Sequence, residues 1–401
     1  MASLKTSTLR ASVSAMSFRK DRSAGIRSSA KRIVALFPDI TGLGGVQESS
    51  RQMIGALEDI VSGPHWRGFY LGLNDSLGDL TLASVGPGVG VQGFGRNKLR
   101  FVARTIHYSR NAGQIVIAAH PNLAIVAAVA RLFNSQLKVI VVTHGIEIWK
   151  KLPVRRRRAL LSADLVLATS QFNFRSLVDV QKIDPRKIRL LRWPLNPKLL
   201  HLADTKATLQ LPSSFPQGRV ILSVGRWSSS ERYKGADELI QAFSKITKNF
   251  QDLSLVFVGG GDDLPRLKQL VAQLGTAAST YFLAGLSTEQ LAACYANAEI
   301  FALPSSGEGF GIVFLEAMAF GLPVIGVAAG GAVDILQNDV NSLVIPSRDS
   351  AAVAQALDQL LNNPELRTRL GRGGAEIVRS KYGFEVFRSN LADILKECGF
   401  A

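Results

Sequence analysis

The sequence predicts an α/β protein built from two domains, each with a doubly wound parallel sheet. Three observations support this fold class. A chain of 401 residues exceeds the roughly 250–300 residues at which a single hydrophobic core stops growing. Short apolar runs alternate with helical patterns in both halves, and the polar stretch 201–218, with Pro212 and Pro216, separates the two series.

Ten runs rich in β-forming residues are the candidate strands, and each is followed by a turn and a helical pattern. Parallel strands connected in this way have helices on both faces of the sheet. If the two sheets face each other, the carboxyl ends of their strands border one interdomain cleft, where such folds bind ligands. The expected strands are Arg32–Phe37, Ile115–Ala119, Lys138–Thr143, Leu165–Thr169 and Ile188–Leu191, then Val220–Val224, Ser254–Val258, Tyr281–Leu283, Ile300–Leu303 and Val324–Val327.

The domain limits follow from these runs. We expect an N-terminal domain at 31–200, a linker at 201–218, a C-terminal domain at 219–375 and a helical segment at 376–401, with packing back onto the N-terminal domain as one option for the last segment. Residues 1–30 are rich in Ser, Ala and basic residues, with Asp21 as the only acid. They lack the apolar stretch of a secretory signal, which leaves a disordered extension, a start at Met16 or a transit-type peptide.

Composition excludes several classes of protein. Two cysteines provide no disulfide framework, and five histidines without a His/Cys cluster argue against a structural metal site. The most apolar window, 115–133, is interrupted by His120, Pro121 and Asn122, so it is not a spanning helix. We therefore expect a cytoplasmic protein, either free or peripheral at the inner face of the plasma membrane.

The charge is concentrated in the first half of the chain. Residues 1–200 carry a net charge of +19, whereas residues 201–401 carry −3. A basic half indicates either an anionic partner or a solvated basic face. The run Trp149–Arg158, which contains Arg155, Arg156, Arg157 and Arg158, suits anionic headgroups or a polyprenyl-diphosphate acceptor. No nucleic-acid fold motif accompanies the charge, so we do not expect nucleic acid as the partner.

The segment Pro304–Glu316 carries the most specific signal. A strand ends at Leu303, a glycine-rich loop follows, and a helix begins near Ile312. Glycines let the backbone approach a ligand, and a helix N-terminus offers unpaired N–H groups to phosphate. Glu308 in the loop and Glu316 in the helix are then placed to accept hydrogen bonds from different hydroxyls of one extended ligand. Upstream, Arg226 and Lys234 follow a strand end and provide two cations for a diphosphate.

These motifs, Glu308-x7-Glu316, Gly225-Arg226…Lys234 and Gly330-Gly331, resemble glycosyltransferase family 4, the retaining enzymes of GT-B architecture with two Rossmann-like domains. The resemblance covers most of residues 31–401. It implies that Arg226 and Lys234 bind the donor diphosphate, that Glu308 contacts the transferred sugar and that Glu316 holds the ribose. It also implies donor contacts from Gly285 and Leu286 near the base, from Gly309, Phe310, Gly311 and Ile312 near sugar and phosphate, and from Gly44 and Gly45.

In the first domain, Gly42-x-Gly44 alone is similar to a dinucleotide-binding loop, but a third glycine and a later acid are missing. His144-Gly-Ile-Glu147 resembles the family's His-Gly-x-Glu element, which implies that His144 faces the transferred sugar and that Glu147 orients the loop or the acceptor. His120 is a weaker candidate for the same cleft. Two positions depart from the family: Trp193–Pro197 replaces an Asn-Gly-Val-Asp-like turn, and Asp334 stands where glutamate is commoner.

The expected function is transfer of a hexosyl unit, mannosyl or glucosyl, from a GDP- or UDP-sugar to a lipid-linked or glycan acceptor in polysaccharide biosynthesis. Catalysis would rest on His144, Arg226, Lys234 and Glu308, without a cofactor. The chain has no Asp-x-Asp motif, so we expect metal-independent activity. Two alternatives remain at this point: a sucrose- or glycogen-synthase-like transferase acting on soluble sugars, and a non-catalytic nucleotide-sugar-binding module.

Overall fold

The computed structural model describes residues 31–400 except 43, 63–64, 81, 83–89, 111–113, 206–208 and 251; the predicted extension 1–30 lies outside the described residues. The chain divides into two compact units. Unit 1 comprises the chain up to Val141 together with Arg158–Asp164, and unit 2 comprises Val142–Arg157 together with Leu165–Phe400. The contiguous domains proposed above, 31–200 and 219–375, remain a prediction.

The first sheet has eight strands in the order β3-β4-β2-β1-β5-β6-β7-β8. β3 is antiparallel to β4, whereas β4, β2, β1, β5 and β6 pair in parallel, as do β7 and β8. Five of the strands were predicted; β2, β3 and β4 were not, because glycines interrupt their apolar pattern. The strands are β1 (Lys31–Phe37), β2 (Trp66–Gly72), β3 (Gly78–Asp79), β4 (Gly90–Gly93), β5 (Ile115–Ala118), β6 (Lys138–Val142), β7 (Leu165–Ala168) and β8 (Ile188–Leu190).

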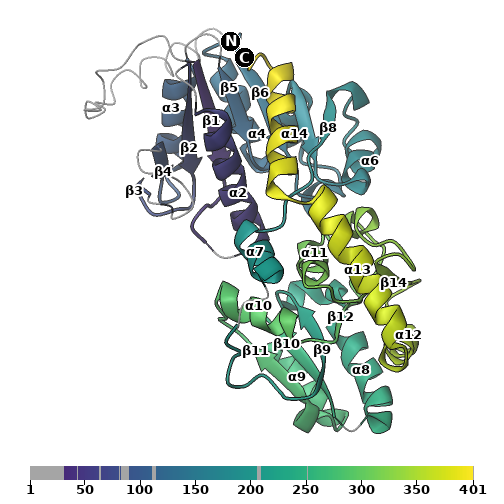
Figure 1. Cartoon of the computed structure of the whole chain (residues 1–401). Helices are drawn as coiled ribbons and strands as arrows, with labels where there is room; N and C mark the ends of the chain where they lie inside the picture. The colour runs from purple at the N-terminus through teal and green to yellow at the C-terminus, as the bar shows by residue number, and fades with distance from the viewer. Residues whose placement is uncertain are drawn as a thin grey trace. The chain divides into compact units, whose positions relative to one another are not determined.

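The second sheet has six strands, all parallel, in the order β11-β10-β9-β12-β13-β14. Each of the five strands predicted in this half is present, and only β14 was not foreseen. The predicted fold class, two parallel α/β sheets, is therefore confirmed (Figure 1). The strands are β9 (Arg219–Val224), β10 (Leu253–Val258), β11 (Thr280–Leu283), β12 (Ile300–Leu303), β13 (Val324–Val327) and β14 (Ser342–Ile345).

Helices connect the strands along the chain. They are α2 (Gly45–Ile60), α3 (Lys98–Ser109), α4 (Ala124–Arg131), α5 (Val154–Leu161), α6 (Gln171–Asp179), α7 (Pro197–Thr205), α8 (Ala236–Ile246), α9 (Leu264–Gln273), α10 (Thr288–Ala296), α11 (Ile312–Ala319), α12 (Ser350–Asn362), α13 (Pro364–Lys381) and α14 (Phe384–Glu397). α7 takes up the first part of the stretch predicted as a linker, and the predicted C-terminal segment begins inside α13.

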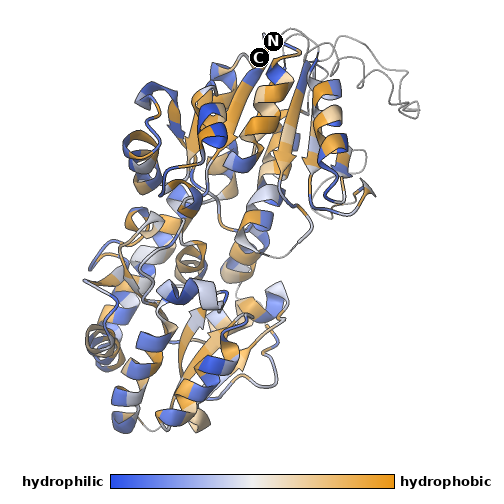
Figure 2. Cartoon of the chain, turned by 180° about the vertical axis from the view of Figure 1, so that it is seen from behind, coloured by the Kyte–Doolittle hydropathy of each residue, from blue (hydrophilic) through white to orange (hydrophobic). Residues whose placement is uncertain are grey.

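The cores of both sheets are apolar because their strands are covered on both faces. All six residues of β10 are buried, as are all four of β5, β7, β12 and β13. Figure 2 shows these strands as predominantly hydrophobic ribbons, whereas the helices carry both hydrophobic and hydrophilic residues. This difference is expected when a helix has only one stripe facing the core. Among the described helices, none combines the length and the hydrophobicity needed to cross a bilayer.

The C-terminal helix α14 and the junction that precedes it contact β8 and the segment that follows β8. Arg189 of β8 forms an ion pair with Glu397 of α14, with 2.7 Å between Nη2 and Oε2. The amide of Leu195 donates a hydrogen bond to the carbonyl of Tyr382, which lies between α13 and α14, at 2.8 Å. These contacts lie within unit 2 and hold the segment after β8 against the end of the chain.

Candidate functional site

The loop between β12 and α11 holds Glu308 in a fixed backbone position. Glu308 forms an isolated parallel β-bridge with Gly330, and its carbonyl accepts a hydrogen bond from the amide of Gly331 at 2.6 Å. The residue is only 9% exposed. Helix α11 begins at Ile312 with Gly311 as its N-cap, as predicted. The bridge shows what Gly330-Gly331 does locally, since it anchors the loop that carries Glu308.

Two cations and two carboxylates meet beside this loop. Nζ of Lys234 lies 3.8 Å from Oε1 of Glu308 and 3.7 Å from Oε2 of Glu231. Arg226 forms an ion pair with the other oxygen of Glu231, while its own side chain remains 73% exposed. Oε1 of Glu308 is buried and has no hydrogen-bond partner among the described residues. The group therefore combines a lysine whose side chain is 13% exposed, an exposed arginine and a buried acceptor oxygen without a hydrogen bond.

The backbone of the β9–α8 connection joins this cation pair to the Glu308 loop. Gly235 has a φ of +78°, and a Cβ added there would lie 2.4 Å from the carbonyl oxygen of Pro304. The amide of Ser306 donates to the carbonyl of Tyr233 at 2.8 Å. Burial, followed by the charge of Glu308, raises the pKa of the Tyr233 hydroxyl. Only glycine permits this contact at position 235, which keeps Lys234 next to Glu308.

Glu316 lies on α11 and is held by a hydrogen bond from α10, the helix that precedes β12 in the chain. The hydroxyl of Tyr295, on α10, donates a hydrogen bond to Oε2 of Glu316 at 2.8 Å. Tyr295 is fully buried, and burial together with the Glu316 charge raises the pKa of its hydroxyl well above the usual value. The tyrosine therefore remains a neutral donor and fixes one carboxylate oxygen of Glu316.

The loop after β6 touches the Glu308 loop at a pair of glycines. Gly145 has a φ of +140°, and a Cβ added there would lie 2.8 Å from both Cα and the carbonyl oxygen of Gly309. The buried amide of Asn173, on α6, donates to the carbonyl of Gly309 at 3.1 Å and to Oγ1 of Thr169 at 2.8 Å. The same side chain accepts a hydrogen bond from Nε1 of Trp149 at 2.9 Å. The structure thus brings the His144–Trp149 loop and the Glu308 loop together within unit 2.

Glu147 and Trp149 have structural partners in this loop. Oε1 of Glu147 accepts a hydrogen bond from the amide of His144 at 2.6 Å, an arrangement that orients the loop. The ring of Trp149 packs near Gly307 and Gly330; a Cβ on Gly330 would lie 2.8 Å from Cη2 of Trp149. The Trp149 ring thus packs against the Glu308 loop, and its predicted role at an acceptor surface stays a prediction.

The four arginines of α5 do not have equal surroundings. Arg155, Arg156 and Arg158 are exposed, whereas Arg157 is half-buried. Nε of Arg157 donates to the carbonyl of Gln181 at 2.9 Å. Three of the four arginines are therefore available to an anionic partner, and the fourth holds the helix in place.

In unit 1, the glycine loop before α2 is supported by its own network. Asp75 is 2% exposed and accepts hydrogen bonds from the amides of Ile40 at 2.9 Å and Thr41 at 2.8 Å. Burial raises the pKa of the Asp75 carboxyl. Arg51 donates to the carbonyl of Ile40 at 2.8 Å. Gly45, the first residue of α2, has open space where a Cβ would be. Asp75 and Arg51 therefore hold residues 40 and 41, shortly before Gly44 and Gly45.

Sequence reasoning missed three residues of these networks. Glu231 lies between Arg226 and Lys234 in the sequence, and this position between two cations was the available signal. Asp334 was noted only as a departure from the family, but its carboxylate accepts hydrogen bonds from the amide of Gln171 at 3.0 and 3.1 Å and so caps α6. Asn173 carries no signal in the sequence, because its partners lie far away along the chain.

The remaining predicted donor residues lie at the ends of strands or in the Glu308 loop. Gly285 and Leu286 follow β11 after Ala284. Phe310 packs against Tyr382 with 6.0 Å between ring centroids.

His120 follows β5 and accepts a hydrogen bond from the amide of Asn122, so it caps a short turn. Within the described part of the chain, no three His, Cys, Asp or Glu side chains gather as a metal-binding group.

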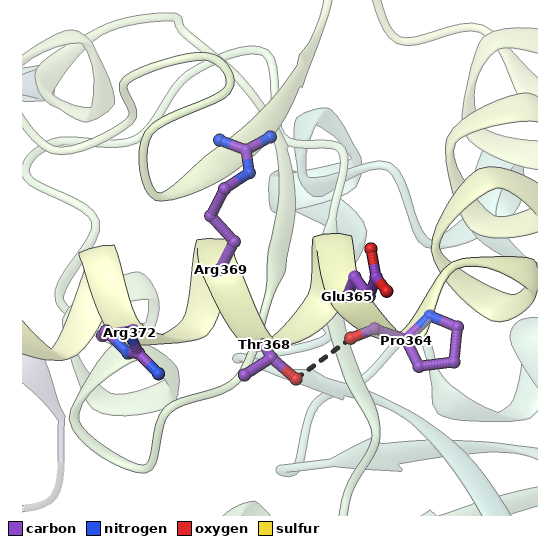
Figure 3. A pocket seen from close by; sticks show the side chains of 5 residues that line it. All are labelled: Pro364, Glu365, Thr368, Arg369 and Arg372. Atoms are coloured by element: carbon purple, nitrogen blue, oxygen red, sulfur yellow. Dashed lines mark hydrogen bonds between the residues drawn. The ribbon is translucent and has the colours of Figure 1, made fainter.

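A separate cavity of about 420 Å³ lies along α13 and contains none of the predicted site residues. Figure 3 shows its lining side chains on one helix, with the Thr368 hydroxyl donating to the carbonyl of Pro364 at 3.0 Å. No buried polar group without a partner belongs to it. We therefore do not assign a ligand to this cavity, which is lined by Pro364, Glu365, Thr368, Arg369 and Arg372.

Residues 210–377 match the family described as "Glycosyl transferases group 1". A protein of Mycobacterium tuberculosis strain H37Rv, "GDP-mannose-dependent alpha-(1-6)-phosphatidylinositol monomannoside mannosyltransferase", is 31% identical over 297 residues, which cover 70% of this chain and 74% of that protein. The "phosphatidyl-myo-inositol mannosyltransferase" of Mycobacterium leprae is 35% identical over 191 residues, covering 47% and 49% of the two chains.

Solved structures share the fold over nearly the whole length. Sucrose-phosphate synthase from Thermosynechococcus elongatus aligns with a TM-score of 0.72 and 23% identity, covering 92% of this chain and 99% of that one. Anabaena HepE in complex with UDP and glucose aligns with a TM-score of 0.69 and 17% identity, covering 91% and 99%. At these identities the two structures establish the GT-B fold alone.

Proposed function

This chain belongs to the glycosyl transferases group 1 family and is a family 4 glycosyltransferase, and on that premise we propose that it moves a mannosyl unit from GDP-mannose to a lipid-linked acceptor. A nucleotide-sugar donor is typical of the family, and membership of it sets aside the non-catalytic binding module. The choice of GDP-mannose and of a lipid-linked acceptor rests on the two mycobacterial relatives named above.

The observation that carries the proposal concerns Oε1 of Glu308, which is buried without a hydrogen bond and lies 3.8 Å from Nζ of Lys234. A buried carboxylate oxygen without a hydrogen bond is costly, by about 1–3 kcal/mol or more, unless a ligand supplies a donor. Hydroxyl groups of the transferred sugar are such donors. Lys234, 3.8 Å away, compensates the charge of Glu308 and is also placed for a phosphate oxygen. One pair of residues can therefore contact the sugar and the phosphate on either side of the bond that breaks.

The rest of the donor would extend on both sides of this pair. Arg226 and Lys234 would bind the diphosphate, and the free amides at the start of α11, near Gly311 and Ile312, would bind it from the opposite side. Glu316, fixed by Tyr295, would accept hydrogen bonds from the ribose. Gly285 and Leu286 would lie near the base, and Gly44 and Gly45 would allow the loop before α2 to approach the phosphate.

We propose retention of configuration by front-face displacement. As the bond to the leaving phosphate breaks, negative charge grows on the diphosphate, and Arg226, Lys234 and the α11 amides stabilise it. The departing phosphate oxygen accepts the proton of the attacking acceptor hydroxyl, so no protein carboxylate needs to form a covalent intermediate. His144 would contact the transferred sugar. The reaction needs no metal in this scheme, a proposal based on the missing Asp-x-Asp motif.

The donor proposal is tested by incubating the protein with GDP-mannose, GDP-glucose, UDP-glucose and UDP-galactose and measuring nucleotide release and thermal shift. A bound donor raises apparent stability by about 2.7 kcal/mol at a hundredfold excess over Kd. We expect turnover with GDP-mannose, lost in Glu308→Ala and Lys234→Ala and retained in Lys248→Ala, a control at an exposed lysine. Turnover that survives both site variants contradicts the site assignment. A UDP-sugar preference, or transfer to soluble saccharides, supports the sucrose-synthase-like alternative instead.

The metal proposal has a separate measurement. Turnover with GDP-mannose is measured before and after EDTA treatment, and again after addition of manganese. We expect the same rate in all three samples. Loss of turnover in EDTA that manganese restores contradicts metal independence, and leaves the donor assignment unaffected.

The acceptor proposal predicts binding to anionic membranes through α5. The test variant replaces Arg155, Arg156 and Arg158 by glutamine and keeps Arg157, which has a structural partner. The control variant removes three charges elsewhere, at the exposed Lys248, Arg372 and Lys381. We expect cosedimentation with phosphatidylserine vesicles to fall in the test variant alone, because each basic side chain near an anionic surface contributes about 1 kcal/mol. Equal binding by both variants contradicts a membrane role for α5.

A further inference from the structure

Trp193 follows β8, in the turn where this chain departs from the family's Asn-Gly-Val-Asp-like pattern. Its side chain is 3% exposed. The indole stacks on the imidazole of His144, with 5.5 Å between ring centroids and 17° between ring planes. Phe387 of α14 packs against the same indole at 5.6 Å and 32°. The ring therefore makes aromatic contacts both with the predicted catalytic histidine and with the C-terminal helix.

The indole N–H indicates that this tryptophan is present for its ring surface. Nε1 is buried and finds no hydrogen-bond partner among the described residues. Leaving such a donor unpaired costs about 1–3 kcal/mol, so a hydrogen bond of Trp193 is not what the position provides. Aromatic pairs contribute roughly 0.5–1.5 kcal/mol beyond the burial of their area and favour defined ring orientations. A stacked partner can thus set the plane of a histidine ring.

The backbone around Trp193 is held at several points. Arg192 pairs with Asp334, with 3.4 Å between Nη2 and Oδ2, and the Asp334 carbonyl accepts from the hydroxyl of Tyr382 at 3.2 Å. The amide of Leu195 donates to the carbonyl of Tyr382 at 2.8 Å. The junction of α13 and α14 therefore fixes the turn on one side, and Phe387 fixes the indole on the other.

We propose that Trp193 is a positioning residue, supported by Phe387, that holds the His144 ring in the orientation needed for sugar transfer. The C-terminal helix α14 then belongs to the working site, although none of the predicted site residues lies on it. The inference rests on the proposed function for the role of His144. The ring stack itself is a property of the free protein, so it can be tested apart from activity.

The test compares Trp193→Phe, which keeps an aromatic ring and removes the N–H, with Trp193→Leu, which removes the ring. Misplacement of a reacting group by about 1 Å costs roughly a hundredfold in rate. We expect Trp193→Leu to lower kcat by about ten- to a hundredfold with little change in the donor KM, and Trp193→Phe to stay within about threefold of the wild type. Phe387→Leu should give an intermediate loss of kcat.

Leu391→Ala is the control for loss of stability in α14, since Leu391 is fully buried on the same helix. It should lower the melting temperature and leave kcat unchanged. The imidazole resonances of 13C-histidine-labelled protein provide the readout that needs no substrate. We expect Trp193→Leu to move the His144 ring signal downfield, out of the indole ring current, while Leu391→Ala leaves it in place.

Four results separate the hypotheses. An unchanged His144 signal in Trp193→Leu overturns the stack, and equal kcat in Trp193→Leu and wild type overturns the positioning role. A kcat loss in Leu391→Ala as large as in Phe387→Leu also overturns it, because general weakening of α14 is then sufficient. If the wild type is inactive with GDP-mannose but the His144 signal moves as expected, the proposed donor fails and the stack is supported.

Discussion

Lys234 Nζ and Glu308 Oε1 are 3.8 Å apart, and they come from two loops that each follow a strand of the second sheet. The same lysine lies 3.7 Å from Glu231, which also pairs with Arg226. The carboxylate of Glu231 therefore forms ion pairs with both Arg226 and Lys234, the two cations that we assign to the donor diphosphate. A phosphate group of the donor would compete with Glu231 for these two positive charges.

This competition leads to a prediction for Glu231→Gln. Removing one negative charge next to both cations should strengthen binding of GDP, since a unit charge at 4 Å contributes about 1 kcal/mol in water and more in a less polar site. We expect Kd for GDP to fall by about tenfold at low salt, with a smaller fall at high salt because the site is partly exposed. Isothermal titration at two salt concentrations measures both effects. Weaker GDP binding in the variant would mean that Glu231 chiefly orders Arg226.

A second prediction concerns the hydrogen bond between Tyr295 and Glu316. Tyr295→Phe keeps the buried ring and removes the hydroxyl that donates to Oε2 at 2.8 Å. Hydrogen bonds to charged groups contribute about 1.5–3 kcal/mol, so the free energy of unfolding should fall by about that amount. If Glu316 holds the ribose, the donor KM should rise severalfold while kcat changes little. Denaturant titration and steady-state kinetics are the measurements; a fall in kcat at constant KM would contradict the ribose assignment.

Gly45 allows a prediction in which stability and function separate. A Cβ added at Gly45 meets no atom within 4 Å, and the residue begins α2. Gly45→Ala should leave the melting temperature unchanged or slightly higher, because alanine is favoured over glycine in helices by about 1 kcal/mol. If the glycine is needed for close approach to donor phosphate, turnover should fall clearly. Gly260→Ala, which also has open space, is the matched control and should keep full turnover. Wild-type kinetics in Gly45→Ala would remove Gly45 from the donor site.

Gly145→Ala, in contrast, should lower both the stability and the turnover of the protein. The φ of +140° at Gly145 and the 2.8 Å approach to Gly309 leave no room for a methyl group. Gly145→Ala should destabilise the protein by about 1–3 kcal/mol and displace the Glu308 loop, so that donor affinity and turnover both decrease. Thermal unfolding and GDP titration measure the two consequences. Unchanged GDP binding in a destabilised Gly145→Ala protein would show that the two loops are not coupled.

The reactivity of Cys294 provides a check on the buried core of the second sheet. Cys294 is fully buried on α10, and burial raises the pKa of its thiol to about 12. Since the thiolate is the reactive form, we expect no reaction of this thiol with DTNB at pH 8 in the native protein and rapid reaction in urea. A Cys398→Ser variant isolates the signal of Cys294. Fast labelling of the native variant would contradict the packing of α10.

The sequence was sufficient for the elements whose pattern is local. Continuous apolar runs such as Ser254–Val258 and Ile300–Leu303 predicted buried parallel strands, and the glycine pattern before Ile312 predicted the helix start. β2 and β4 were missed because Gly68, Gly72 and Gly90 dilute the apolar signal, and their place in the sheet is set by pairing with β1 and with each other. Such pairing depends on residues more than twenty positions away.

The candidate site divides in the same way. Arg226, Lys234, Glu308 and Glu316 were predicted as site residues from motif spacing, and the structure places Lys234 beside Glu308. The contacts of Asn173 with Gly309 and of Trp193 with His144 were not predicted, because they join segments separated by 136 and 49 positions. Asp334 appeared as an irregularity in a motif, and only the structure shows that it caps α6. Side chains that support a site through space leave little trace in a single sequence.

The contact between Gly145 and Gly309 has a consequence for engineering donor specificity. The Glu308 loop and the loop that carries Gly145 are in direct backbone contact at these two glycines. Grafting the Glu308 loop from another transferase replaces only one of these two loops. A transplanted loop with a larger residue at 309, or a recipient altered at 145, would be pushed away from its partner. Exchange of donor preference therefore requires the two loops to be moved as a matched pair, together with Asn173, whose amide joins them.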